Sequence, residues 1–260
     1  MPKIAEAIAA IERFAPLSLQ EEYDNSGLQY GSPSAELTGI TVTLDLNPAV
    51  AEEAVKNGDN LIISHHPTFF HPLKCLDPTK PELKAMEICI KNGIAVYAAH
   101  TNVDKCKGGL NDYVLNMLGA TVLCEAEPGS LPRFGVFPEP VTLGELSETV
   151  AEKLSDKGVR FVGDRHKVIG KIALITGGGG DSDSVNAAIA GGADLFLSGD
   201  FKYHVIRFAK DAGYAIISFG HYESEIPFMP LIADVLKKEG FENVHQAISL
   251  ETPYNTEGRI

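Results

Sequence analysis

The first hundred residues alternate between short apolar runs and longer stretches in which apolar side chains recur at helical spacing, as Ile4 and Ile8 do. The apolar runs are continuous and rich in β-branched residues, which is typical of buried strands. Asn47 and Pro48 have the order of an N-cap and a first helical residue. The pattern predicts helices at 3–14, 47–56 and 80–92, a turn-rich loop at 23–33, and strands at 39–45, 60–64 and 94–98. This alternation predicts an α/β fold.

The second half of the chain repeats the order of the first. Apolar runs at 171–176 and 193–198 follow one another as the first two strands of the first half do. The third strand of each half is followed by a histidine and, four residues later, by a carboxylate. These endings are His100-x-x-x-Asp104 and His221-x-x-x-Glu225.

Two explanations of this repetition stay open. Internal duplication would produce it, and so would a shared β-α-β rhythm, because few residues are identical between the two stretches. The boundary is expected near residues 125–133, which divides the chain into α/β halves at 1–125 and 126–260. The predicted fold is therefore α/β, with two similar halves packed around one site at which strands end.

Polar side chains follow the predicted strands where ligand sites of parallel α/β sheets form, at the carboxyl ends. His65 and His66 follow one strand, Asp104 another, and His221 with Glu225 a third. Convergence of these strand ends would bring three imidazoles and two carboxylates into one pocket. The sequence therefore predicts that two divalent metal ions bind there.

The adjacent histidines His65 and His66 would point to opposite sides of an extended strand, so both reach one site only where the strand bends. Pro67 supports such a bend, and two neighbouring metals suit this geometry better than one. The alternative is a pair of hydrogen-bonded surface histidines. The apolar sequence on both sides favours the metal interpretation, since it is a poor place for unpartnered imidazoles.

The spacing of His221 and Glu225 places them on one face if a helix begins near Tyr222. Taken alone, the favoured interpretation is that Glu225 supports the start of that helix, and Asp104 could be a turn or capping residue. A donor set of imidazoles and carboxylates without cysteine indicates Zn, Fe, Mn, Co or Ni.

Two further histidines are candidates for catalysis rather than for metal binding. His100 is expected beside the metals, where it would orient a ligand, bind substrate or transfer a proton, and His204 could do similar work. The glycine run 177–180 between a strand and a helix could cradle a phosphate, but it lacks a Walker motif, so a plain turn is favoured.

The composition excludes several classes of protein. With 44% hydrophobic and 22% charged residues among 260, the chain is expected to be a soluble globular protein. A net charge of -13 argues against nucleic-acid and anionic-membrane surfaces, although a bound cation would still admit a small anionic substrate. Four cysteines without Cys-x-x-Cys spacing, and no signal-peptide pattern, predict a cytoplasmic protein.

Five segments together resemble the Nif-three-like family, also known as GTP cyclohydrolase I type 2, over about residues 1–250. They are Asp24-Asn25-Ser26-Gly27-Leu28-Gln29, Ser64-His65-His66-Pro67, His100-Thr101-Asn102-Val103-Asp104, Gly199-Asp200-Phe201-Lys202-Tyr203-His204 and Gly220-His221-Tyr222-Glu223-Ser224-Glu225. The resemblance implies a toroidal homohexamer of two-domain α/β chains with a dinuclear metal centre. Its ligands would be His65, His66, Asp104, His221 and Glu225.

Two functions are compatible with this resemblance. In the first, the protein is a metal-dependent hydrolase that acts on a nucleotide or a phosphorylated small molecule; with GTP, water would attack C8 of guanine. In the second, it is a non-catalytic, metal-dependent scaffold or regulatory interaction protein. Open coordination positions at a five-ligand site favour the hydrolase.

Overall fold

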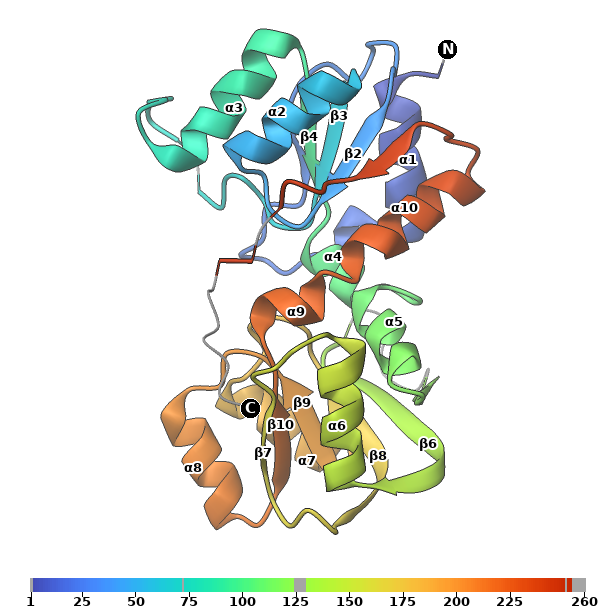
Figure 1. The fold of residues 1–260 in the computed structure, drawn as a ribbon, viewed down its shortest axis with the longest axis vertical. Helices are drawn as coiled ribbons and strands as arrows, with labels where there is room; N and C mark the ends of the chain where they lie inside the picture. Colours follow the sequence, from blue (N-terminus) through green and yellow to red (C-terminus); the bar gives the residue numbers. More distant parts are fainter. Residues whose placement is uncertain (1, 72, 124–129, 251, 254–260) are drawn as a thin grey trace. The chain divides into compact units, whose positions relative to one another are not determined.

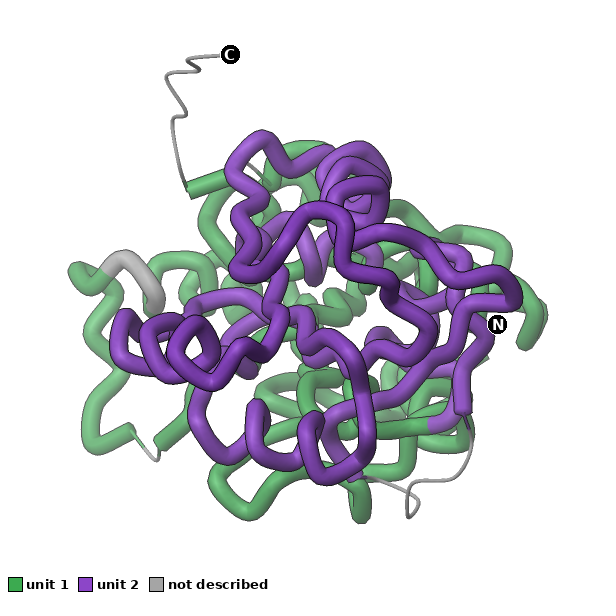
Figure 2. The backbone as a smooth tube through the Cα atoms, turned by 90° about the horizontal axis from the view of Figure 1, so that it is seen from below, with its two compact units in different colours: residues 1–106, 228–255 green, residues 107–227, 256–260 purple. Residues whose placement is uncertain are grey.

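The chain forms two compact α/β units in a computed structural model, which describes residues 2–71, 73–123, 130–250 and 252–253. Unit 1 comprises the described residues of 1–106 and 228–255, and unit 2 comprises residues 107–227 where they are described (Figure 2). No helix in these ranges is both long and apolar enough to cross a membrane.

Unit 1 is a five-stranded sheet of order β1-β4-β3-β2-β11, with helices on both faces (Figure 1). Strands β2, β3, β4 and β11 are parallel, and β1 pairs antiparallel with β4. Its elements are α1 (Ile4–Phe14), the 3₁₀ helix η1 (Leu17–Leu19), β1 (Gly27–Tyr30), β2 (Ile40–Thr43), α2 (Pro48–Asn57), β3 (Leu61–Ser64), α3 (Pro81–Asn92), β4 (Ala95–Ala98), α4 (Thr101–Lys105), α10 (Phe228–Lys238) and β11 (Val244–Gln246).

The three predicted helices of unit 1, α1, α2 and α3, begin and end within one residue of their predicted bounds. Asn47 caps α2 by accepting a hydrogen bond from the backbone N–H of Val50, and Gly58 ends the helix with a φ of 77°. Helices α2 and α3 pack on one face of the sheet, in a core that includes Ile62 and Val96. The next residue of β4, Tyr97, faces the opposite side, where its hydroxyl donates to Glu12 of α1 at 3.2 Å.

Unit 2 is a six-stranded sheet of order β5-β6-β8-β9-β10-β7, in which β8, β9 and β10 are parallel. Helices α7 and α8 pack on one face, in a core that includes Phe196 and Ile216. Helices α5 and α6 contact β6. Its elements are α5 (Leu110–Met117), β5 (Thr121–Leu123), β6 (Arg133–Thr142), α6 (Leu143–Lys153), β7 (Arg160–Val162), β8 (Val168–Leu174), α7 (Ser182–Ala190), β9 (Leu195–Ser198), α8 (Tyr203–Asp211), β10 (Ala215–Ser218) and α9 (His221–Glu225).

The two sheets share a common part, which confirms the prediction of two similar α/β halves. The order β1-β4-β3-β2 in unit 1 corresponds to β7-β10-β9-β8 in unit 2, with three parallel strands and one antiparallel strand beside the third. In each unit this antiparallel strand precedes the three shared parallel strands in the chain, and a helix joins each of these parallel strands to the next.

The structure differs from the sequence prediction in the loop at 23–33 and at the end of the chain. The loop predicted at 23–33 contains strand β1, because this short segment forms antiparallel hydrogen bonds with β4. The strand begins at Gly27 and is followed by Gly31, which have φ of 119° and 113°. The predicted boundary between residues 125 and 126 lies outside the described residues. The end of the chain returns to unit 1, where β11 pairs with β2.

Candidate metal centre

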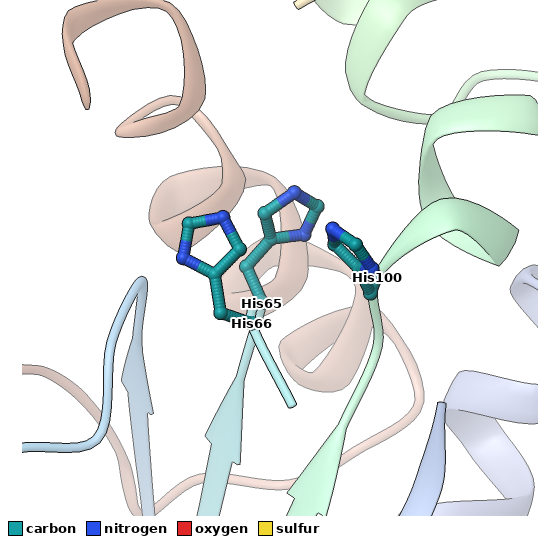
Figure 3. A group of neighbouring side chains, drawn as sticks. All are labelled: His65, His66 and His100. Carbon is teal, nitrogen blue, oxygen red and sulfur yellow. The ribbon is translucent and has the colours of Figure 1, made fainter. Parts of the chain in front are cut away.

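Unit 1 brings together three histidines at the carboxyl ends of two neighbouring parallel strands (Figure 3). His65 and His66 follow β3, and their backbone N–H groups both donate to the carbonyl of Leu44 beyond β2. His100 follows β4 and is the N-cap residue of the five-residue helix α4. The strand-end placement expected from the sequence is therefore present in this unit.

The three rings lie close enough to share a cation. Their centroids are 5.0 Å apart for His65 and His100, 5.1 Å for His65 and His66, and 5.5 Å for His66 and His100. One ring nitrogen of each lies within 4.8 Å of the others. Asp104 approaches from α4, with its Oδ1 3.8 Å from Nε2 of the fully buried His65.

Each histidine of this cluster donates a hydrogen bond from Nδ1 to an oxygen that can only accept. His65 donates to the carbonyl of Ala99 at 2.9 Å. His66 donates to Asp45 and His100 to Asp24, both at 2.8 Å. A neutral imidazole bonded in this way has its lone pair on Nε2, which is the arrangement of metal-binding histidines in proteins.

Asp24 is fixed more firmly than the other two acceptors. Besides His100 it accepts the backbone N–H groups of Asn25 at 2.7 Å and Thr101 at 3.1 Å, and the hydroxyls of Ser26 and Thr101. Burial by itself raises the pKa of this carboxyl, but the hydrogen bonds from His100 and Thr101 outweigh it and hold the pKa well below the usual range. Asp24 is therefore an anion at any physiological pH.

Unit 2 contains a second cluster, which is described by itself. His221 is the first residue of α9, and its Nε2 lies 3.1 Å from Oε2 of Glu225, as the four-residue spacing predicts. Its Nδ1 donates to Asp200 at 2.6 Å. The hydrogen bond to Glu225 is the main reason that the pKa of His221 rises to about 9, and Asp200 adds to the rise.

The glycine run 177–180 packs against this pair. A Cβ on Gly177 would lie 1.9 Å from Oε1 of Glu225, and a Cβ on Gly178 would lie 3.7 Å from the ring of His221. The N–H of Gly177 donates to Ser224 Oγ at 2.9 Å. The run is thus a close-packed turn that leaves space for the Glu225 carboxylate, in agreement with the favoured interpretation of the sequence.

These donors fit divalent metal ions. Both clusters combine imidazole nitrogens with carboxylate oxygens, and no cysteine is present in either. Such donors suit Zn, Fe, Mn, Co and Ni. The Nδ1 hydrogen bonds fix the orientation of all four rings, as ligands of a metal require.

Comparison with known proteins assigns the chain to a family. A sequence model described as Duf34/NIF3 (NGG1p interacting factor 3) matches residues 2–253. The chain belongs to the Duf34/NIF3 family. A Clostridium perfringens member named GTP cyclohydrolase 1 type 2 homolog is 34% identical over 256 residues, which cover 96% of this chain and 97% of the relative. A Lactococcus lactis member with the same name is 38% identical over 241 residues, covering 90% and 91%.

A solved structure supports the same assignment. The crystal structure of a Bacillus cereus protein related to NIF3 superimposes with a TM-score of 0.87 at 25% identity, over 98% of this chain and 99% of that one. The resemblance inferred from the sequence motifs is confirmed, and so is the α/β fold.

The two predicted catalytic histidines of this Duf34/NIF3 chain lie in different surroundings. His100 lies within the unit 1 cluster, so its geometry suits a metal ligand as well as the predicted role beside the metals. His204 is exposed in the first turn of α8, and among the described residues it has no hydrogen bond or ion pair.

Three functional candidates were missed by sequence reasoning. Asp24, Asp45 and Asp200 anchor the Nδ1 atoms of His100, His66 and His221. Each stands in a turn or at a strand end, and Asp200 has a φ of 50°, a conformation that a non-glycine residue rarely adopts. An aspartate in a turn is too common a signal to be recognised in the sequence without the tertiary contact.

Proposed function

We propose that this chain is a metal-dependent hydrolase of a nucleotide or a phosphorylated small molecule, similar to a GTP cyclohydrolase. It would bind two divalent ions through the residues predicted from the sequence, namely His65, His66, Asp104, His221 and Glu225. The observation that supports this most directly is the hydrogen bond from Nδ1 to an acceptor oxygen in the histidines of both clusters. The names of the curated relatives support the substrate class.

Bound ions would supply Lewis acidity and lower the pKa of water, which is the chemistry a hydrolase needs. The residues of the chain prepare the site for it. Asp24, with its hydrogen-bond donors, keeps the His100 ring in one orientation and one tautomer. Glu225 holds its carboxylate against the glycine run, so its oxygens stay beside His221.

The first experiment measures bound metal and turnover together. Elemental analysis of the purified protein should give about two ions per chain, and GTP and a panel of phosphoesters should show turnover by chromatography and by the ultraviolet spectrum of the purine. Glu225→Ala should lose both. Glu223→Ala is the matched control, because Glu223 lies in the same helix but outside the His221 pair. Full metal content with no turnover of any substrate would reject the hydrolase and leave the scaffold role.

A second experiment separates the two roles open to His100. His100→Gln is expected to keep the metal content and reduce turnover if the ring transfers a proton, since such groups contribute roughly 10²- to 10⁴-fold. A loss of metal would make it a ligand instead. The same substitution at the exposed His166 serves as control for loss of a surface imidazole.

The hexamer implied by the sequence resemblance is part of the same proposal. Light scattering after size-exclusion chromatography should give a mass near six times the 27.9 kDa of one chain. A monomeric or dimeric mass at micromolar concentration would reject it.

A further inference from the structure

Phe70 is an aromatic side chain that lies beside the unit 1 histidines and is open to solvent. Its ring centroid is 5.7 Å from that of His100, and the two planes meet at 82°. The residue is 44% exposed. One part of the ring therefore faces the cluster while another part is available to a ligand.

The backbone next to Phe70 is held in place. Asn25 donates a hydrogen bond from its side-chain amide to the carbonyl of Phe69, and Gln29 donates to the carbonyl of Asn25 at 2.7 Å. The Phe69 side chain packs against the core beneath α2 and α3. The exposed ring of Phe70 thus follows an anchored residue.

We propose that Phe70 stacks on the planar ring of a heteroaromatic substrate, a purine base, and so determines which substrates this site accepts. The inference rests on the proposed function, because it assumes that the unit 1 histidines face the reacting part of the substrate. Stacked and edge-to-face aromatic rings have centroids about 4.5–7 Å apart. A base stacked on Phe70 would therefore lie about as far from the Phe70 ring as the His100 ring does. Stacking accepts any flat base, and the polar cluster would supply the remaining selectivity.

The absence of tryptophan from the chain permits a direct test. Phe70→Trp places the only indole of the chain at the proposed stacking position, and bases quench indole fluorescence on contact. Phe208→Trp is the matched control, because Phe208 of α8 in unit 2 is also 44% exposed. GMP should quench the first variant saturably and the second only by collision. Ribose 5-phosphate, which lacks the base, should quench neither.

Calorimetry on the purified, metal-containing protein gives the second measurement. Phe70→Ala is expected to weaken GMP binding roughly 5- to 150-fold, the usual loss for one aromatic–base stack, and to leave ribose 5-phosphate within about twofold. Phe70→Tyr should restore GMP binding, and Phe208→Ala should not change it.

The outcomes distinguish this inference from the proposed function. If Phe70→Ala binds GMP as well as the wild type, or changes only the oligomeric mass, stacking is rejected while hydrolysis stands. The same holds if the wild type turns over phosphoesters but binds no GMP. A protein that binds no GMP and hydrolyses nothing rejects both.

Discussion

Gly177→Ala is expected to weaken metal binding by the proposed ligands His221 and Glu225 while unit 2 stays folded. The substitution has two separable effects. Gly177 has a φ of 62°, and an L-residue in this region costs about 1–2 kcal/mol. The new Cβ would also lie 1.9 Å from Oε1 and 2.8 Å from Cδ of Glu225, so the carboxylate oxygen must move by about 1.5 Å or more to reach an ordinary contact distance.

A displacement of this size matters more for metal binding than for folding. Metal–ligand distances tolerate only about 0.2 Å, so the moved carboxylate would no longer fit the same coordination shell. We expect at least a tenfold loss of affinity for Zn²⁺, which corresponds to about 1.4 kcal/mol.

Gly213→Ala is the matched control. Gly213 has a φ of 65°, and nothing lies within 4 Å of the position its Cβ would take. It should lose a similar 1–2 kcal/mol in urea unfolding and keep full metal affinity, as measured by competition with a chromophoric chelator. Equal stoichiometry and affinity for Zn²⁺ in Gly177→Ala and Gly213→Ala would refute the prediction that the displaced carboxylate weakens metal binding.

Three further predictions concern other parts of the chain. Asp45→Leu should lower metal affinity about 10- to 100-fold, because it removes the oxygen that accepts the hydrogen bond from Nδ1 of His66. Competition with a chelator measures this, and an unchanged affinity would contradict the anchoring role of Asp45. Asp112→Ala should lower the free energy of unfolding in urea by about 3–5 kcal/mol, since it leaves the buried Arg133 unpaired. Asp211→Ala, which breaks an exposed ion pair, should lower it by at most about 1 kcal/mol. Equal losses in the two variants would count against burial as the cause. Cys89 should resist iodoacetamide at pH 8 while the exposed Cys75 reacts, because burial raises the pKa of the Cys89 thiol to about 12. Peptide mapping measures the labelling of each cysteine. Equal labelling would show that the surroundings of Cys89 open to solvent.

The repeating part of the fold was predictable because its signal is local. Continuous apolar runs gave the three shared parallel strands of each unit but not β11, and turn chemistry at residues such as Asn47 and Gly58 set the helix ends. The strand β1 was missed because its four residues, which begin at Gly27 and precede Gly31, are too few to show a period of their own. Its pairing with β4 comes from tertiary contact.

The anchoring carboxylates could not be predicted for the same reason. Asp24 lies 76 residues before His100, and Asp200 lies 21 residues before His221. Ligand types follow from residue identity and spacing, whereas the partner of each Nδ1 depends on which turns the fold brings together. The sequence therefore indicated the candidate ligands and not the residues that orient them.

The shared part of the two sheets bears on the question of duplication. A β-α-β rhythm alone does not require an antiparallel strand beside the third parallel strand in both units. Nor does it require that the third parallel strand be followed by a histidine whose Nδ1 is bonded to an aspartate. His100 follows β4 and precedes a five-residue helix, and His221 follows β10 and starts one. These coincidences favour duplication over a shared rhythm.

The units then differ where the second parallel strand ends. Unit 1 has His65 and His66 at this point, and unit 2 has Gly199 and Asp200 in the corresponding place. A Cβ at position 199 would lie 2.4 Å from the carbonyl oxygen of Gly177, so no histidine fits there while Gly177 lies against Glu225. If the two units arose by duplication, the residues after the second parallel strand became a histidine pair in unit 1 and part of a close-packed turn in unit 2. This explains physically why the imidazole donors are concentrated in unit 1.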